Sequence, residues 1–352
     1  MDSRLTTTAA HTDINMQQAP IPVSIVMCTY NGAPWVAQQL DTILAQTYPL
    51  LEIVVQDDRS TDDTWQILEQ YAAKHRLIHL YRNEGERGVN GNFLSAVLRA
   101  KGELVAFSDQ DDLWEPDKIA RQVAALTEHD AWLVSHKSKP FSDDGHNVHY
   151  DARRPNTGLL RLCYQTEMHG HTQLFRRQLL QHILPPPPLL AVTKYDVLTQ
   201  LAAAAAGKVW FINAPLTHFR RHTGANTLTD MTTSKHSIHN ASRQLMFCLH
   251  HYRTLKKRSR NDYKMVACFL DSLPFHNKEK DDALLMMRLQ TGRGAVNFLR
   301  FQCFCLRHRH EIFYAPAHGL ANALRAWLYP VLCLHYKRRY ILENNKEEKK
   351  QN

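Results

Sequence analysis

Several signals that would place a chain outside the ordinary cytoplasmic enzymes are missing here. Residues 1–20 are polar and contain no apolar core of the kind that an export signal needs. No run reaches the roughly 18 uncharged apolar residues that suggest a membrane-spanning helix. The seven cysteines are odd in number and irregularly spaced, which favours free thiols in a reducing compartment. We therefore expect a cytoplasmic protein, and peripheral contact with the inner face of the cytoplasmic membrane stays open.

A glycine-rich phosphate loop and recognised nucleic-acid-binding motifs are missing as well. A nucleotidyltransferase would normally carry such a loop after its first strand, where this chain has Tyr30-Asn31-Gly32-Ala33-Pro34. The formal net charge of +9 suits nucleic acid, an anionic membrane surface or a phosphorylated substrate. Because the excess charge lies outside the acidic clusters described below, we expect no nucleic-acid partner. A nucleotidyltransferase and a non-catalytic basic nucleic-acid-binding protein on a nucleotide-binding scaffold remain the alternatives.

Short apolar runs alternate with segments of helical periodicity from residue 23 onward. This alternation predicts an α/β fold with a mostly parallel central sheet. The predicted strands are 23–29, 51–55, 77–81, 103–107, 131–135 and 209–212, and a turn at Pro215 follows the last. The predicted helices are 34–44, 64–74, 93–100, 114–125, 176–183 and 195–206, and residues 136–157 are predicted to form a long loop.

The composition divides the chain into four predicted segments. They are a disordered leader (1–20), an α/β domain (21–230), a mainly helical basic region (231–343) and a disordered tail (344–352). Within the basic region, Leu320–Leu334 is apolar and Lys337-Arg338-Arg339 follows. This stretch is too short and too charged to span a bilayer, so it either lies on an anionic membrane or packs on the α/β domain.

Three carboxylates occur within four residues in Asp109-Gln110-Asp111-Asp112, directly after the apolar run Leu104–Phe107. Clustered acids repel one another unless a cation or a set of donors neutralises them. Hard divalent ions prefer carboxylate oxygens together with substrate phosphates. In an open α/β sheet the carboxyl ends of the strands form the ligand-binding edge. The pattern therefore predicts a site for Mg²⁺ or Mn²⁺, and the alternative is a polar turn in which Asp112 caps the next helix.

The motifs together resemble those of family-2 glycosyltransferases with the GT-A fold. The matching pieces are Val23–Gly32, Val54–Thr64, Ser108–Trp114, Tyr195-Asp196 and Phe219–His222. The form of the acidic motif is most similar to that of bacterial rhamnosyl- and galactosyltransferases of O-antigen or capsule synthesis. Two positions depart from the family pattern: Arg59 stands where the family usually has glycine, and Lys194-Tyr195 precedes the acidic residue.

The resemblance implies transfer of a sugar from a nucleotide-diphosphate sugar to a saccharide or lipid-linked saccharide, with inversion at the anomeric carbon. It implies that Asp196 is the catalytic base, and that Asp109, Asp111 and Asp112 hold the metal. The donor-binding candidates are Thr29, Tyr30, Asn31, Asp57, Asp58, Asn92, Asp109, Gln110, Arg221 and His222. The acceptor-binding candidates are Trp114, His169, Gly170 and His171.

Several of these candidates have a plain structural alternative. Asp196 would simply be the N-cap of a helix, and Asp57 or Asp58 would cap the helix that starts near Thr64. Arg221 would be a solvated surface charge, and the two histidines would be solvated loop residues.

Overall fold

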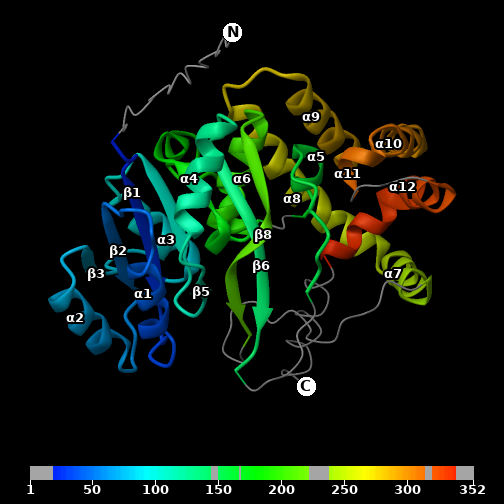
Figure 1. Cartoon of the computed structure of the whole chain (residues 1–352). Helices are drawn as coiled ribbons and strands as arrows, with labels where there is room; N and C mark the ends of the chain where they lie inside the picture. Colours follow the sequence, from blue (N-terminus) through cyan, green and yellow to red (C-terminus); the bar gives the residue numbers. More distant parts are fainter. Residues whose placement is uncertain (1–18, 144–149, 166–167, 222–237, 314–318, 338–352) are drawn as a thin grey trace, which may run out of the picture.

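A single eight-stranded sheet runs through the part of the chain that the structure describes (Figure 1). The computed structural model describes residues 19–143, 150–165, 168–221, 238–313 and 319–337. The strand order is β3-β2-β1-β4-β7-β6-β8-β5. The strands are β1 (Val23–Thr29), β2 (Glu52–Asp57), β3 (Ile78–Arg82), β4 (Leu104–Ser108), β5 (Leu113–Trp114), β6 (Leu133–Phe141), β7 (Leu174–Arg176) and β8 (Val209–Arg220).

The first four strands are all parallel, and so is the pair β6 and β8. β7 is antiparallel to both β4 and β6, and β5 is antiparallel to β8. The predicted α/β fold with a mostly parallel central sheet is therefore confirmed. Parallel strands need crossover connections, which α1, α2 and α3 supply in the first half of the chain.

Helices cover both faces of the sheet. The longer ones are α1 (Val36–Leu44), α2 (Thr64–Lys74), α3 (Val89–Val97), α4 (Lys118–Glu128), α6 (Tyr195–Ala205), α7 (Ile238–His250), α8 (Tyr252–Ser272), α9 (Lys278–Thr291), α10 (Ala295–Arg307) and α12 (Leu320–Leu332). The short ones are α5 (Leu159–Leu162), α11 (Arg309–Ile312) and the 3₁₀ turns η1 (Gly170–Thr172), η2 (Arg177–His182), η3 (Pro188–Val192) and η4 (Cys333–Lys337).

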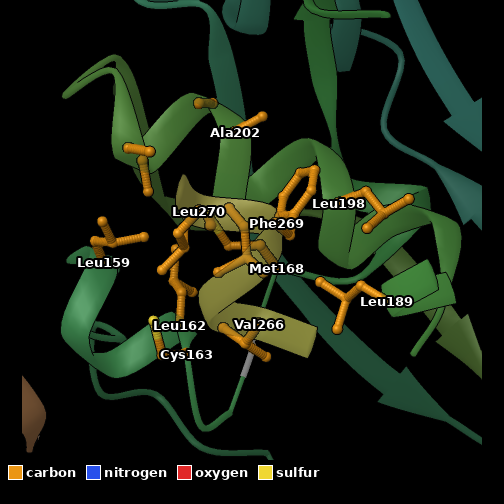
Figure 2. Close-up of a cluster of buried hydrophobic side chains, with 14 of the residues drawn as sticks. Leu159, Leu162, Cys163, Met168, Leu189, Leu198, Ala202, Val266, Phe269 and Leu270 are labelled. Carbon is orange, nitrogen blue, oxygen red and sulfur yellow. The ribbon is translucent and has the colours of Figure 1, made fainter. Parts of the chain in front are cut away.

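Successive side chains of β1 point to opposite faces of the sheet, and a separate hydrophobic core lies on each face. Ile25 and Met27 pack on one face with residues of α1 and α4, while Val26 packs on the other face. The second core continues into the C-terminal helices through residues such as Tyr263 and Tyr329. Figure 2 shows part of it, where α8 packs against α5 and α6. The C-terminal helices thus share a core with the sheet, and the domain boundary near 230 stays a prediction because residues 222–237 lie outside the described part.

The predicted helix over 114–125 is wrong at its start. Leu113 and Trp114 form β5 and pair with β8, and α4 begins only at Lys118. Pairing with β8 holds the chain extended up to Pro116, and a residue before proline is disfavoured in helical conformation. The predicted helix over 176–183 is also inexact, since Arg176 ends β7 and the rest is the 3₁₀ turn η2.

The loop predicted over 136–157 is wrong at its start, and the turn predicted at Pro215 is wrong. β6 continues to Phe141, and β8 runs without a break from Val209 to Arg220. Pro215 stands opposite Lys137, where the register of the two strands shifts. Proline has no N–H to donate, so an irregular point of the ladder is where it fits. The extended pair of strands carries Phe219 and Arg220 to the acidic motif.

Candidate active site

The carboxyl ends of β1 and β4 are joined by the side chain of Gln110. Its Oε1 accepts from the N–H of Tyr30 at 2.9 Å, and its Nε2 donates to the carbonyl of Tyr30 at 3.0 Å. A Cβ on Gly32 would lie 2.2 Å from the same Oε1, so a larger residue here would displace the Gln110 side chain from its bonds to Tyr30. Tyr30 itself is about half exposed beside the junction. The structure therefore brings together the two strand ends that the sequence placed at one edge.

Asp57 binds the end of β2 to its neighbours. Its carboxylate accepts from Thr29 Oγ1 at 3.0 Å, from the N–H of Ser60 at 2.9 Å and from Arg82 Nη1 at 3.0 Å. The side chain is fully buried. Asp57 thus connects the ends of β1, β2 and β3 within the protein interior. Its contact with a donor nucleotide stays a prediction.

Asp58 holds the loop that follows β3. Its Oδ1 accepts from Asn83 Nδ2 at 2.7 Å and its Oδ2 accepts from the N–H of Gly88 at 2.7 Å. The N-cap position of α2 is Asp63, and neither Asp57 nor Asp58 bonds to the first turn of that helix. Helix capping is therefore not what these two acids do.

Two residues of this edge have left-handed backbone conformation. Asn31 has φ +48° and Arg59 has φ +63°. Asparagine tolerates this region, and its side-chain Oδ1 accepts from the N–H of Thr61 at 2.9 Å. The φ of Arg59 gives the physical reason why the family prefers glycine at this position. The guanidinium of Arg59 donates to the carbonyl of Gly85 at 2.9 Å, which holds the loop in place.

Asn92 lies on α3 and is buried against β2. Its Oδ1 accepts from Gln56 Nε2 at 3.0 Å, and its Nδ2 donates to the carbonyl of Gln56 at 3.3 Å. The amide is thus engaged in fixing the helix on the sheet. Its donor-binding role stays a prediction.

The acidic motif surrounds a buried histidine. His171 Nδ1 lies 3.2 Å from Asp109 Oδ2 and 3.4 Å from Asp112 Oδ2, and its Nε2 lies 3.0 Å from Ser138 Oγ. Asp112 is buried, whereas the side chain of Asp109 is 37% exposed. His171 comes from η1, which packs beside β4. The sequence predicted His171 as an acceptor contact, and the structure places it between two of the three acids.

The carboxyl groups of the motif differ in acidity because they differ in surroundings. Burial raises the pKa of Asp112, and the charges of Asp109 and Asp111 raise it further against the opposing charge of His171. Burial also acts to raise the pKa of Asp109, but the hydrogen bond and charge of His171 outweigh it, and that pKa is lowered. Asp109 is therefore the more reliably ionised of the two at neutral pH.

Arg220 is a site residue that the sequence analysis did not select. Its Nε donates to the carbonyl of Asp111 at 2.9 Å, its Nη2 donates to Gln38 Oε1 at 2.7 Å, and its Nη1 pairs with Asp143. Its backbone N–H donates to Asp112 Oδ1 at 3.3 Å. The side chain is buried, and its bonds hold Asp111 and Asp112 of the acidic motif in place. The motif match at 219–222 contained this residue, but only the register of β8 distinguishes it from its neighbour Arg221.

Asp196 lies at the start of α6, in the first turn, and does not cap the helix. The N-cap position is Lys194, and Asp196 Oδ2 accepts instead from the N–H of Gly170 at 3.0 Å. Its Oδ1 is buried and has no hydrogen-bond partner among the described residues. Burial raises the pKa of Asp196 to about 6, with the charge of Asp109 adding to the effect against that of Lys194. A carboxylate with a free oxygen and a pKa near neutrality suits a general base.

The unusual Lys194-Tyr195 pair has a structural explanation. Tyr195 is buried and its ring stacks on Phe93 with 4.0 Å between centroids. The N–H of Tyr195 donates to Asn90 Oδ1 at 3.0 Å, which ties α6 to α3. A Cβ on Gly170 would lie 2.4 Å from the hydroxyl of Tyr195, so glycine is needed for the close approach that bonds Gly170 to Asp196. The departure from the family pattern therefore positions Asp196.

The other predicted site residues differ in their surroundings. His169 and His171 stack on the ring of Phe219, over which the guanidinium of Arg221 also lies at 4.8 Å. Trp114 is buried in the core with the ammonium of Lys118 3.5 Å from its ring centre. The structure thus gives Trp114 a packing role, and its contact with an acceptor stays a prediction. His222 lies outside the described residues.

Asp109, Asp112 and His171 could hold a metal ion, since their ligand atoms all lie within 4.8 Å of one another. Carboxylates and imidazole suit Mn²⁺, and carboxylates alone suit Mg²⁺. Asp111 is half-buried on the same turn. Two of the three acids predicted as metal ligands, Asp109 and Asp112, therefore lie together, and His171 is a fourth candidate that their spacing in sequence could not reveal. Metal binding by Asp111 stays a prediction.

Comparison with known proteins supports what the motifs predicted. Residues 24–184 match the family model "Glycosyl transferase family 2". Over these residues the chain is similar to glycosyltransferase family 2. The uncharacterised glycosyltransferase alr2836 of Nostoc is 28% identical over 219 residues, which are 58% of this chain and 66% of the relative. The putative teichuronic acid biosynthesis glycosyltransferase TuaG of Bacillus subtilis is 30% identical over 164 residues, or 43% of this chain and 65% of the relative.

A shorter match is closer in sequence. The Escherichia coli protein UDP-Glc:alpha-D-GlcNAc-diphosphoundecaprenol beta-1,3-glucosyltransferase WfaP is 38% identical over 101 residues, or 29% of this chain and 39% of that protein. The chain thus spans about two thirds or less of the length of these relatives. The alternatives of a nucleotidyltransferase and a nucleic-acid-binding protein are not favoured.

Among solved structures, Staphylococcus aureus TarS 1-349 in complex with UDP-GlcNAc superimposes with a TM-score of 0.54. The match is 17% identical and covers 91% of this chain and 92% of TarS 1-349. The fold is therefore the GT-A fold, with the C-terminal helices included in the superposition. In the described part of the chain, every helix is too short or too polar to cross a lipid bilayer.

Proposed function

We propose that this chain transfers a sugar from a nucleotide-diphosphate sugar to a saccharide or lipid-linked saccharide in the synthesis of a cell-surface polysaccharide. The observation that supports it most is the convergence of Asp109, Asp112, His171 and Asp196 at the carboxyl edge of a family-2 fold. The relatives named above include enzymes whose names describe cell-surface polymers and a lipid-linked acceptor. A rhamnosyl or a hexosyl donor is compatible with this proposal.

The chain's own residues supply the binding edge and the electrostatics. Asp109, Asp111 and Asp112 are the proposed ligands of Mg²⁺ or Mn²⁺, and His171, which lies against Asp109 and Asp112, is a further candidate. When bound, the metal would stabilise the charge that gathers on the departing diphosphate. Tyr30, Asn31 and Gln110 line the proposed nucleotide side, next to Thr29, Asp57 and Asp58, which keep the strand ends together. Arg221 and His222 are proposed to face the phosphates.

Asp196 is proposed to take the proton of the acceptor hydroxyl as the new glycosidic bond forms. Its free Oδ1 would receive the proton, while the N–H of Gly170 holds Oδ2 in place. A single base on the acceptor side leads to inversion at the anomeric carbon. His169 and Phe219 would form the wall along which the acceptor sugar lies.

The acceptor would be reached at an anionic membrane surface if it is attached to a lipid. The predicted membrane segment at 320–340 is described only up to Lys337, and Arg338 and Arg339 lie outside the described residues. In the structure α12 packs on α10, and its residues Leu320, Leu324 and Trp327 are exposed. The helix thus packs on the protein by one face and leaves another face free for a membrane.

The test is turnover with a panel of nucleotide-diphosphate sugars and lipid-linked saccharide acceptors in detergent, in the presence of Mn²⁺. Release of the nucleoside diphosphate should depend on one donor and on the acceptor, and NMR of the product should show the inverted anomeric configuration. A product that retains the donor's configuration would contradict the role of Asp196, and no turnover with any donor would contradict the function.

A further inference from the structure

Helices α10 and α12 share a short sequence pattern. Each helix has a glycine before it and an asparagine, a leucine, an arginine and an aromatic residue at the same relative positions. These are Gly294, Asn297, Leu299, Arg300 and Phe304 for the first helix, and Gly319, Asn322, Leu324, Arg325 and Tyr329 for the second. Neither the net charge nor the motifs of the active site require this pattern to occur in both helices.

The two helices are also alike in structure. Gly294 and Gly319 have φ +86° and +88°, a conformation that L side chains rarely adopt, and each directly precedes a helix of 13 residues. Phe304 and Tyr329 are buried at equivalent positions. The two helices pack on each other, and Gln302 Nε2 donates to the carbonyl of Trp327 at 3.0 Å.

The same face of each helix is turned outward. Leu299 is 52% exposed and Leu324 is 59% exposed, and the arginine that follows each of them is also exposed. A single exposed leucine needs no explanation, but here an exposed leucine occurs at the equivalent position of two helices that pack on each other.

Helix α7 extends this surface, since it packs against α12 at the end of the molecule away from β3 (Figure 1). We call the exposed apolar residues of the three helices the docking face: Met246, Leu249, Val296, Leu299, Leu320, Leu324 and Trp327. They make up more than half of the large apolar side chains that are exposed in the described part of the chain. Such a concentration on three adjoining helices marks an interaction surface.

Most of the charges around the docking face are positive, and the exposed Glu311 of α11, a helix that contacts both α10 and α12, is an exception. Helices α10 and α12 contain Arg300, Arg307 and Arg325 and no aspartate or glutamate. Lys256, Arg260 and Arg293 line a cavity of about 60 Å³ at the start of α10, and no carboxylate is among the described residues that line it. An apolar strip with a tryptophan, bordered by arginines, has the character of helices that lie in the interface of an anionic bilayer.

We propose that the docking face lies on an anionic lipid membrane, with Leu299, Leu324 and Trp327 at the acyl boundary and Arg300 and Arg325 at the phosphates of the headgroups. The proposal rests on the proposed function, because it would bring the active site to an acceptor held in the membrane. Each of the two packed helices has an exposed leucine followed by an exposed arginine, and both pairs would contribute to the contact.

The first test is co-sedimentation with phosphatidylglycerol vesicles and with phosphatidylcholine vesicles. The variant carries Leu299→Glu and Leu324→Glu, and a matched control carries Leu77→Glu and Leu98→Glu, which are 39% and 68% exposed on the opposite part of the molecule. We expect the wild type and the control to bind phosphatidylglycerol alike and the variant to bind at least tenfold more weakly. Equal binding by variant and control, or a wild type that does not sediment, overturns the proposal.

The second test separates charge from apolar contact. Changing Arg300 and Arg325 to glutamine should weaken binding to phosphatidylglycerol by about thirtyfold at low salt, because each arginine near an anionic surface adds to the attraction. Changing Lys74 and Arg76 to glutamine removes the same charge from the exposed end of α2 and should change little. Equal losses in the two variants would show a general effect of net charge and would overturn the placement of the arginines.

Two further readouts keep this proposal separate from the proposed function. Nucleotide binding without vesicles should be the same for the wild type and for Leu299→Glu with Leu324→Glu. If vesicles are bound but no sugar is transferred, the proposed function fails while the docking face stands. If the wild type is a dimer that the same variant dissociates, and vesicles are not bound, the docking face is an interface between copies and the membrane proposal is wrong.

Discussion

The edge of the sheet and the α10–α12 pair use buried and exposed residues in opposite ways. At the edge, charged and polar side chains such as Asp57, Asp112 and Arg220 are buried and bonded to one another. At the helix pair, apolar side chains such as Leu299 and Leu324 are exposed. The first arrangement holds a rigid geometry inside the protein, as positioning of reactants requires. Exposed apolar side chains are favourable only when a partner or a membrane removes them from water. The two regions should therefore respond differently to substitution.

The largest effect expected at the edge is on the proposed base. Asp196→Asn keeps the size of the side chain and an oxygen that can accept from Gly170. Turnover should fall by about 10² to 10⁴, the contribution of a positioned general base. Steady-state kinetics on the preferred donor measures it.

The matched control is Asp130→Asn, which changes an exposed aspartate that pairs with Lys208 far from the acidic motif. It should leave turnover unchanged. Loss of donor affinity in Asp196→Asn, with turnover preserved at saturation, would assign Asp196 to binding instead.

The pH dependence of stability gives a second test of the burial of Asp196. Burial raises the pKa of Asp196 to about 6 in the folded state, above its ordinary value near 3.8. The folded state thus holds the proton more tightly than the unfolded state, so this group stabilises the fold below pH 4 and the contribution is lost as pH rises to about 6. The loss is about 3 kcal/mol at 1.36 kcal/mol per pKa unit.

Urea unfolding of the wild type and of Asp196→Asn from pH 4 to pH 8 measures this term. Above pH 6 the variant should be the more stable one, and the difference should disappear toward pH 4. The kcat/KM of the wild type should rise with pH up to about 6, because the base must be ionised. A pH-independent difference between the two proteins would contradict the burial of an ionised Asp196.

Arg220 should matter for binding without touching the donor. Arg220→Lys keeps the charge but loses the forked geometry that bonds the carbonyl of Asp111 and Gln38. Affinity for a nucleoside diphosphate with Mn²⁺ should fall by about 10- to 100-fold, as expected when a partner that orients metal ligands is lost. Calorimetry measures the affinity, and Arg177→Lys, whose Nε donates to the carbonyl of Gly102 away from the acidic motif, is the control.

Substitutions in the docking face should have the smallest effect on the protein itself. Leu324→Ser should change the free energy of unfolding by no more than about 0.5 kcal/mol, as is usual for exposed positions. Tyr329→Ala, one turn away and buried, should cost about 3–5 kcal/mol. Urea unfolding compares the two, and similar losses would mean that Leu324 packs inside the protein.

The sequence was informative where structure follows from local pattern. The first four strands and helix α2 were predicted closely, because short apolar runs, helical periodicity and polar turns alternate in this part of the chain. The acids at the ends of β2 and β4 could be placed at one edge because parallel strands share a direction. The left-handed φ of Arg59 explains why the family usually has glycine at this position, and the bond of Arg59 to the carbonyl of Gly85 holds the turn although the residue differs.

Other features depend on contacts between distant segments, which a single sequence does not display. The pairing of β5 with β8 turned a predicted helix start into a strand. The roles of His171 and Arg220 follow from the meeting of η1, β8 and the acidic motif, and no spacing in the sequence brings these three together. The continuous core between the sheet and the C-terminal helices is likewise a property of the tertiary packing.

Calorimetry of nucleoside diphosphate binding tests the central claim most directly. A panel of nucleoside diphosphates is titrated into the wild type with Mn²⁺ or Mg²⁺, into the wild type with EDTA, and into Asp111→Ala with metal present. We expect one nucleotide to bind with metal, and its affinity to fall at least tenfold both in EDTA and in the variant. Equal affinity in all three conditions would contradict a metal-assisted glycosyltransferase site at this edge of the sheet.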